Sequence, residues 1–201
     1  MSTTDVTTVI VGAGHSGLAM SHHLQARGIS HVLLERGEIA NSWRNERWNS
    51  LRLLTPNWQN RLPGFVYEGG DPDGFMACRE VVQFIDAYAG AINAPVVTGT
   101  NVERIEADAD GYTLSTSNGR WRCQALVLAS GAHNLPAIPQ AAERLPADVL
   151  SVSAFDYKSP DNIPDGGVLV VGASATGLQL AAELTQAGRQ VTLAVGEHVR
   201  M

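Results

Sequence analysis

Three closely spaced glycines follow a short apolar run near the start of the chain: Gly12, Gly14 and Gly17. In this pattern the first glycine allows a tight turn after a strand, the second lets a ligand approach the backbone, and the third lets the next helix pack closely on the strand. The start of that helix would present the N–H groups around His15 and Ser16 to a negatively charged group. The pattern therefore predicts a site for the pyrophosphate of a dinucleotide.

An acidic residue stands where such a site needs one. Residues 31–34 predict a second strand, and Glu35 follows it, about twenty residues beyond Gly14. A carboxylate at this point accepts hydrogen bonds from the ribose of an adenosine. We therefore expect a dinucleotide with an adenosine ribose in this unit rather than a mononucleotide such as FMN, which has no such ribose for Glu35 to bind.

The same pattern recurs later in the chain, in the same register. Its glycine-rich turn contains Gly172, Ser174, Ala175, Thr176 and Gly177. Serine in place of the middle glycine is tolerable, because serine is small and its hydroxyl can donate to a phosphate. Val195 occupies the position equivalent to Glu35, so no carboxylate stands there to repel a 2′-phosphate, and Arg200 follows it. The second unit is therefore expected to prefer NADPH to NADH, unless His198 and Arg200 are only solvated loop residues.

The sequence also predicts the helices and strands that position these turns. Apolar residues on one face predict a helix over 79–92, and Asn118-Gly119 predicts a hairpin turn. Residues 125–131 predict a buried parallel strand that ends in a turn of small residues. Further extended segments are expected at 96–98, 101–107, 112–117 and 120–124. The expected fold class is α/β: a Rossmann-like FAD/NAD(P)-binding fold with a β-meander insertion and a truncated second Rossmann unit.

The expected organisation has three parts. Residues 1–131 form the FAD-binding domain, residues 132–166 form a proline-rich connection, and residues 167–201 begin an NAD(P)-binding domain. One strand–helix–strand unit cannot cover both faces of its sheet. We therefore expect the natural enzyme to continue beyond Met201.

Residues 36–78 show little periodicity, and long irregular segments in compact domains are usually functional. Aromatic and basic residues alternate in this segment, among them Arg36, Trp43 and Arg44. Flat apolar area next to positive charge suits a planar ring system that carries a diphosphate. The alternative is that the tryptophans belong to the core and the arginines are solvated.

Composition argues against several classes of function. The net charge of −6 does not suit a nucleic-acid surface. No apolar run could span a bilayer and no signal peptide precedes the first strand, so we expect a cytoplasmic protein with no membrane partner. Cys78 and Cys123 are far apart in sequence, so no redox-active cysteine pair is expected. His22 and His23 are adjacent and cannot share one ion in the usual i, i+4 manner, so no metal site is expected either. The oligomeric state is left open.

Several motifs together carry a family resemblance: the first glycine-rich turn with Glu35, Ser42-Trp43-Arg44, the stretch from Ser50-Leu51 to Pro56, Ala129-Ser130-Gly131, and the second glycine-rich turn. Over its whole length the chain resembles the N-terminal half of a flavin-containing monooxygenase-like FAD/NAD(P)-binding oxidoreductase. The resemblance implies FAD at the first turn and NADPH at the second. It also implies that Ser130 and Gly131 lie where the chain crosses between domains, and that the backbone at Val102 contacts the adenine.

The chain departs from this family at two points. The nearest match to the monooxygenase signature F-x-G-x-x-x-H-x-x-x-[YFW] keeps only its last residue, Tyr157. Leu54 stands where the family has an asparagine beside the flavin. The resemblance implies hydride transfer from NADPH to flavin, followed by O2 activation on a small organic substrate. Two alternatives are a reductase of a quinone, metal ion or carrier, and a truncated, non-catalytic FAD-binding fragment. No catalytic residue is assigned.

Overall fold

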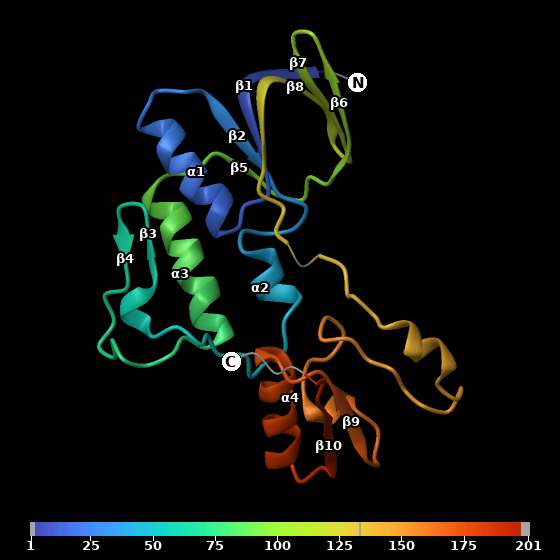
Figure 1. The fold of residues 1–201 in the computed structure, drawn as a ribbon. Helices are drawn as coiled ribbons and strands as arrows, with labels where there is room; N and C mark the ends of the chain where they lie inside the picture. The colour runs from blue at the N-terminus through green and yellow to red at the C-terminus, as the bar shows by residue number, and fades with distance from the viewer. Residues whose placement is uncertain (1–2, 133, 198–201) are drawn as a thin grey trace. The chain divides into compact units, whose positions relative to one another are not determined.

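The computed structural model describes residues 3–132 and 134–197. The chain forms two compact units (Figure 1). The first contains the residues up to Asn45 and those from Leu53 to Leu135, and the second contains Glu46–Arg52 and the residues from Pro136 onward. The chain therefore passes into the second unit and back before it enters that unit again. The division expected from the sequence does not contain this early exchange.

A six-stranded sheet organises the first unit, with the strand order β5-β2-β1-β8-β7-β6. Its parallel part contains β1 (Thr3–Val11), β2 (His31–Leu34), β5 (Val96–Val97) and β8 (Gly119–Leu128). Its antiparallel part is the meander of β6 (Val102–Asp108), β7 (Gly111–Thr116) and β8. The predicted α/β fold with a meander is confirmed.

Alternating side chains place a separate apolar core on each face of the sheet. Ile10 and Leu33 are fully buried on the face that also packs against α1 (His15–Gln25) and α3 (Cys78–Ala91). Val9 and Val32, one residue earlier on the same strands, are buried with Leu114 of the meander. Successive strand residues point to opposite faces, so helices cover one face and the meander covers the other. Figure 1 shows both layers.

The strand β8 differs from what its sequence predicts. Residues 120–124 and 125–131 were expected as two elements, but a single strand runs from Gly119 to Leu128. It pairs antiparallel with β7 along its first half and parallel with β1 along nearly its whole length. One strand can serve two neighbours because each of its edges carries its own hydrogen bonds. The expected burial does not extend to its end, since Leu128 is 68% exposed.

The segment expected to be irregular contains short elements. These are α2 (Asn41–Asn45), a 3₁₀ turn η1 (Asn57–Gln59) and a small hairpin of β3 (Arg61–Leu62) and β4 (Phe65–Val66). The helix α3 begins one residue before its predicted start, because the Glu80 carboxylate accepts the Ala77 N–H at 2.7 Å. Elements this short carry too few residues for a periodic pattern.

The second unit contains one strand–helix–strand motif. Its parallel strands β9 (Val168–Val171) and β10 (Val191–Ala194) flank α4 (Ala175–Gln186). The connection before β9 contains the 3₁₀ turns η2 (Gln140–Arg144) and η3 (Pro160–Asn162). Leu169 and Val171 of β9 are 60% and 69% exposed. One face of this two-stranded sheet is therefore open in the described part of the chain.

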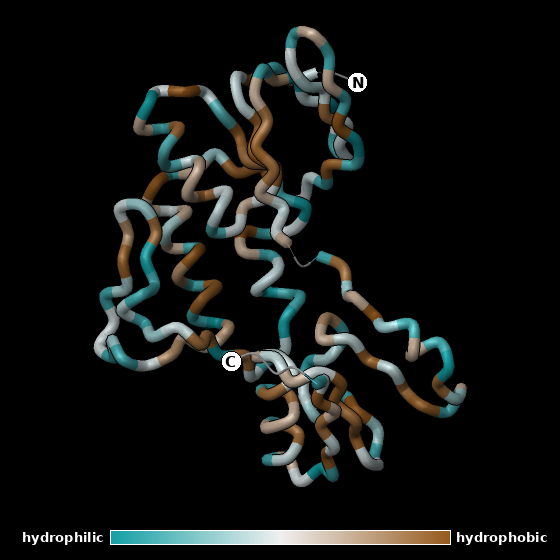
Figure 2. Tube along the Cα trace, in the orientation of Figure 1, coloured by the Kyte–Doolittle hydropathy of each residue, from teal (hydrophilic) through white to brown (hydrophobic). Residues whose placement is uncertain are grey.

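Hydrophobic residues concentrate on strands and on α3 rather than on one continuous run (Figure 2). Within residues 3–132 and 134–197, no helix is both long and apolar enough to cross a membrane.

Candidate nucleotide-binding sites

The first glycine-rich turn has the geometry that its sequence predicts at two of its three glycines. Gly12 has a φ of +105°, which side-chain-bearing residues rarely adopt, and a Cβ there would lie 2.5 Å from the Ala129 carbonyl oxygen. A Cβ at Gly17 would overlap the Gly12 carbonyl oxygen. Gly12 therefore permits the turn after β1, and Gly17 permits α1 to pack against that turn.

Gly14 has an ordinary extended backbone conformation. Its φ of −83° and ψ of −176° are values that any residue can adopt. A Cβ at Gly14 would meet no protein atom within 4 Å. The requirement for glycine therefore does not come from the protein itself. The space is one that a side chain would fill and that the phosphates of a dinucleotide would need.

The start of α1 borders this space. Gly14 is the N-cap residue, and no side chain caps the helix there. His15 and Ser16 follow in the exposed first turn. The first N–H groups of a helix have no partner within the helix and carry partial positive charge. The residues present therefore fit a pyrophosphate.

Glu35 lies directly against the turn. Its side chain is buried, and its carboxylate accepts the Ala13 N–H at 2.8 Å and the Gly37 N–H at 3.0 Å. The Glu35 carbonyl also accepts the Thr100 N–H at 2.8 Å. Glu35 thus joins the end of β2 to the glycine-rich turn. This structural role was not expected from the sequence, and it is additional to the predicted role at a ribose.

The predicted crossing turn lies beside the first glycine-rich turn. The Ala129 N–H donates to the Val11 carbonyl at 2.9 Å, which continues the pairing of β8 with β1. Gly131 has a φ of +88°. The Asn134 side chain donates to the carbonyls of Ser130 and Gly131 at 2.7 and 3.1 Å. Sequence reasoning did not identify Asn134, whose only signal was its position after the small-residue turn.

Val102 stands at the start of β6, two residues beyond the Thr100 that bonds Glu35. It is half-buried and packs against the core cluster under the meander. The chain therefore brings the backbone near Val102 to the same end of the sheet as Glu35. A contact between Val102 and an adenine stays a prediction.

The predicted ring-binding residues lie in and beside α2. Trp43 packs partly buried against the core between helices and sheet. The Arg44 guanidinium pairs with Asp86 of α3 at 2.7 Å and with Glu38 at 3.2 Å. Arg44 would have to leave these carboxylates to reach a cofactor. Arg36 directly follows Glu35 and is exposed. Cofactor binding by these three residues stays a prediction.

The second glycine-rich turn repeats the geometry of the first. Gly172 has a φ of +104°, and a Cβ at Gly177 would overlap the Gly172 carbonyl oxygen. Ser174 has φ −79° and ψ 178°, nearly the conformation of Gly14, so serine is accommodated without backbone strain. The neighbouring Ala175 and Thr176 open α4.

The residues expected to select the second nucleotide lie just after β10. Val195 is 53% exposed there, at the position that corresponds to Glu35 after β2. The predicted 2′-phosphate ligand Arg200, and His198 with it, lie outside the described residues.

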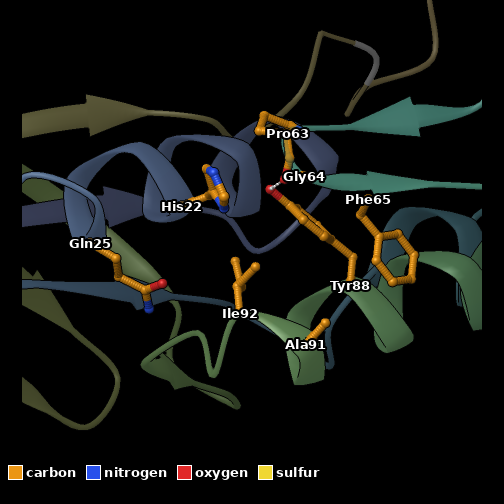
Figure 3. A pocket seen from close by; sticks show the side chains of 8 residues that line it. All are labelled: His22, Gln25, Pro63, Gly64, Phe65, Tyr88, Ala91 and Ile92. Carbon is orange, nitrogen blue, oxygen red and sulfur yellow. Dashed lines mark hydrogen bonds between the residues drawn. The ribbon is translucent and has the colours of Figure 1, made fainter.

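A separate pocket of about 350 Å³ lies on the helical face of the first unit (Figure 3). It is lined by His22 and Gln25 of α1, Pro63, Gly64 and Phe65 of the hairpin, and Tyr88, Ala91 and Ile92 at the end of α3. The Tyr88 hydroxyl donates to the Pro63 carbonyl at 3.1 Å, and burial raises the pKa of Tyr88. None of the predicted cofactor residues lines this pocket.

Neither cysteine belongs to a redox pair or a metal site in the described part of the chain. Cys123 is buried, and the Cys78 thiol donates to the Trp43 carbonyl at 3.0 Å. Burial raises the pKa of the Cys123 thiol. Within the same residues, no group of three or more His, Cys, Asp or Glu side chains could hold a metal ion.

Known proteins resemble this chain in sequence or in fold. An uncharacterized CzcO-like oxidoreductase from Geobacillus kaustophilus is 34% identical over 196 residues, covering 97% of this chain and 56% of that protein. The indole-3-pyruvate monooxygenase YUCCA6 of Arabidopsis thaliana is 30% identical over 202 residues, covering 96% and 48%. A flavin-containing monooxygenase from Stenotrophomonas maltophilia has the same fold, with a TM-score of 0.85 at 23% identity, covering 97% of this chain and 59% of that one.

The chain spans about half the length of the curated relatives that it matches. By their names, the first of these relatives is an oxidoreductase, the second is a monooxygenase, and the solved structure is of a flavin-containing monooxygenase. With residues 9–200 matching the family model, the chain belongs to the pyridine nucleotide-disulphide oxidoreductase family.

Proposed function

We propose that the chain forms the nucleotide-binding half of an FAD-dependent, NADPH-using oxidoreductase of the flavin monooxygenase-like type. The observation that carries this proposal is the duplicated glycine-rich turn, with an acid after β2 and an uncharged residue after β10. An acid suits an adenosine ribose with free hydroxyls, whereas its absence suits a nucleotide with a 2′-phosphate. The two turns are therefore suited to different dinucleotides.

In this proposal the chain's own residues bind and orient the cofactors. The turn from Gly12 to Gly17 and the first N–H groups of α1 hold the FAD pyrophosphate, and Glu35 accepts the ribose hydroxyls. The turn from Gly172 to Gly177 and the start of α4 hold the pyrophosphate of NADPH. When bound, the flavin supplies the redox chemistry, accepting electrons from the reduced pyridine nucleotide and passing them to a second acceptor.

The second acceptor decides between two reactions. Monooxygenation of a small organic substrate is the first candidate, because YUCCA6 and the Stenotrophomonas maltophilia protein are described as monooxygenases. Reduction of a quinone, metal ion or carrier is the alternative, favoured by the loss of the monooxygenase signature at Ala147, Val149 and Ser153. A disulfide reductase that works through two neighbouring cysteines is not supported by the positions of Cys78 and Cys123.

The test uses the full-length protein. We expect it to purify with bound FAD and to oxidise NADPH with a higher kcat/KM than NADH. Under ¹⁸O₂, a monooxygenase would place labelled oxygen in an organic product, whereas a reductase would leave the product unlabelled and consume NADPH without O2 when given an acceptor. Absence of FAD from the folded protein, or no oxidation of either nucleotide with any acceptor, would refute the proposal.

A further inference from the structure

A short segment from the first half of the sequence, Glu46–Arg52, is built into the second unit. Trp48 is 4% exposed. The Asn49 N–H donates to the Lys158 carbonyl at 2.9 Å, and the Lys158 ammonium donates to the Arg47 carbonyl at 3.2 Å. The guanidinium of Arg47 also lies over the Phe155 ring, 5.9 Å from its centroid. The segment is thus held by its backbone as well as by buried side chains.

Arg52 connects this segment to α4. The Arg52 N–H donates to Oε1 of Gln179 at 3.3 Å, and Nε2 of Gln179 donates to the Arg52 carbonyl at 3.1 Å. The amide side chain therefore pairs with both main-chain groups of Arg52, as a neighbouring strand would. This fixes the backbone of Arg52 in position and direction.

The contact lies towards the N-terminus of α4. The same helix carries Glu183 one turn further on, and Glu183 accepts the Tyr157 hydroxyl at 2.8 Å. Of these two contacts, that of Arg52 is therefore nearer to the helix start. Gln179 lies four residues beyond Ala175, so roughly 6 Å along the helix axis separate them. This distance is comparable with the length of an extended arginine side chain.

Gln179 is particular to the second unit. The register that aligns Gly17 with Gly177 aligns Ala19 with Gln179, and an alanine cannot make this pair. The first unit holds its glycine-rich turn through Glu35 instead. The second unit, which has Val195 in that place, therefore has a different connection between its helix and a neighbouring segment.

We propose that Arg52 is a phosphate ligand of the pyridine nucleotide in the second unit, and that Gln179 is the positioning residue that holds it there. This inference rests on the proposed function, because it assumes a dinucleotide at the start of α4. A guanidinium binds phosphate oxygens in a bidentate manner and adds a full charge to the partial charge of the helix N-terminus. Arg52 thus gives the second turn a cation that its own motif lacks.

The experiment measures the dissociation constant of NADP⁺ for the full-length protein by calorimetry. We expect Arg52→Ala to weaken binding roughly tenfold to hundredfold, as loss of a charge-assisted hydrogen bond does. Arg52→Lys keeps the charge but not the bidentate geometry, so its dissociation constant for NADP⁺ should lie between those of the wild type and Arg52→Ala. Because a full charge is lost, the salt dependence of binding should also become shallower in Arg52→Ala. FAD content should not change in any of these variants, since the segment packs in the second unit.

A double variant separates positioning from general stability. If Gln179 acts through Arg52, Gln179→Ala should weaken NADP⁺ binding severalfold alone and have no further effect in the Arg52→Ala background. Matched controls are Gln186→Ala, at the exposed end of the same helix, and Arg104→Ala, which removes an exposed arginine from the first unit. Both should bind NADP⁺ as the wild type does.

These measurements test the role of Arg52 separately from the proposed function. Wild-type protein that holds FAD but binds no NADP⁺ would refute the proposed function. Wild-type binding that Arg52→Ala and Arg52→Lys leave intact would overturn the inference alone. If Gln179→Ala weakens NADP⁺ binding equally in the wild-type and the Arg52→Ala backgrounds, Gln179 has a purely structural role. That result would overturn the proposal that Gln179 positions Arg52. Thermal unfolding identifies any variant that fails to fold, and Arg52→Lys then decides the role of Arg52.

Discussion

Replacing Gly14 by valine tests whether glycine is required at this position by the ligand rather than by the fold. The conformation of Gly14 is open to any residue, and a Cβ there would meet no protein atom within 4 Å. The substitution should therefore change the unfolding free energy of the apoprotein by only about 1 kcal/mol, which reflects a poorer N-cap. The valine side chain would instead occupy the space that the pyrophosphate needs.

The expected loss is in FAD binding. Displacing the phosphates from two backbone N–H groups removes two charge-assisted hydrogen bonds, together roughly 3–6 kcal/mol, or at least about a hundredfold in affinity. Gly14→Ser is the matched control, because Ser174 has the same conformation in the second unit. Gly17→Ala is the opposite control, because its Cβ would overlap the Gly12 carbonyl oxygen and should destabilise the apoprotein itself.

The assay is flavin absorbance per polypeptide after purification, followed by FAD titration and thermal unfolding of the apoprotein. Gly14→Val should fold and stay colourless, Gly14→Ser should retain FAD, and Gly17→Ala should lose stability and FAD together. A folded Gly14→Val protein with stoichiometric FAD would refute the assignment of this turn to a pyrophosphate.

Further predictions concern the residues around the two turns. Glu35→Ala should lower both FAD retention and apoprotein stability, by roughly 1–3 kcal/mol for each backbone N–H left without its acceptor, and Glu35→Gln should restore part of the stability in denaturant titrations. Gly177→Ala should weaken NADP⁺ binding and leave FAD content unchanged, and a normal NADP⁺ titration would contradict the packing inferred for α4. Val195→Glu should shift the kcat/KM preference from NADPH towards NADH, because a carboxylate repels a 2′-phosphate; equal use of both nucleotides by the wild type would refute this. The hydrogen bond with Arg122 lowers the pKa of Asp108 to about 2. The ion pair therefore stabilises the fold above about pH 4, and this stabilisation is lost as the pH falls through 2. The melting temperature of Asp108→Asn should accordingly lie below that of the wild type at pH 6 and equal it below pH 2.

Local pattern was enough to predict the two strand–turn–helix–strand motifs. Gly12 and Gly17 each have a role that depends on near neighbours in sequence, a turn after a strand and the packing of the next helix. The helix of residues 79–92 and the hairpin at Asn118-Gly119 were found for the same reason, since periodicity and turn chemistry are local properties. The structure confirms these elements to within one or two residues.

Predictions that depended on distant residues were less complete. The ion pair of Arg44 depends on Asp86, which lies on another helix. The hydrogen bond of the Glu35 carboxylate depends on the Ala13 N–H, in a turn much earlier in the chain. The strand β8 is continuous because it pairs with β7 on one edge and with β1 on the other. A local sequence pattern does not predict such pairing.

The sequence by itself determined the kind of ligand to be sought, because phosphate binding at a helix N-terminus requires only a few residues at fixed spacing. The tertiary structure decided why each glycine is needed: Gly17 for contact with the protein, and Gly14 for the space left beside it. It also placed Glu46–Arg52 in the second unit, where Gln179 binds the backbone of Arg52. That pairing joins residues far apart in the chain, and only the folded arrangement brings them together.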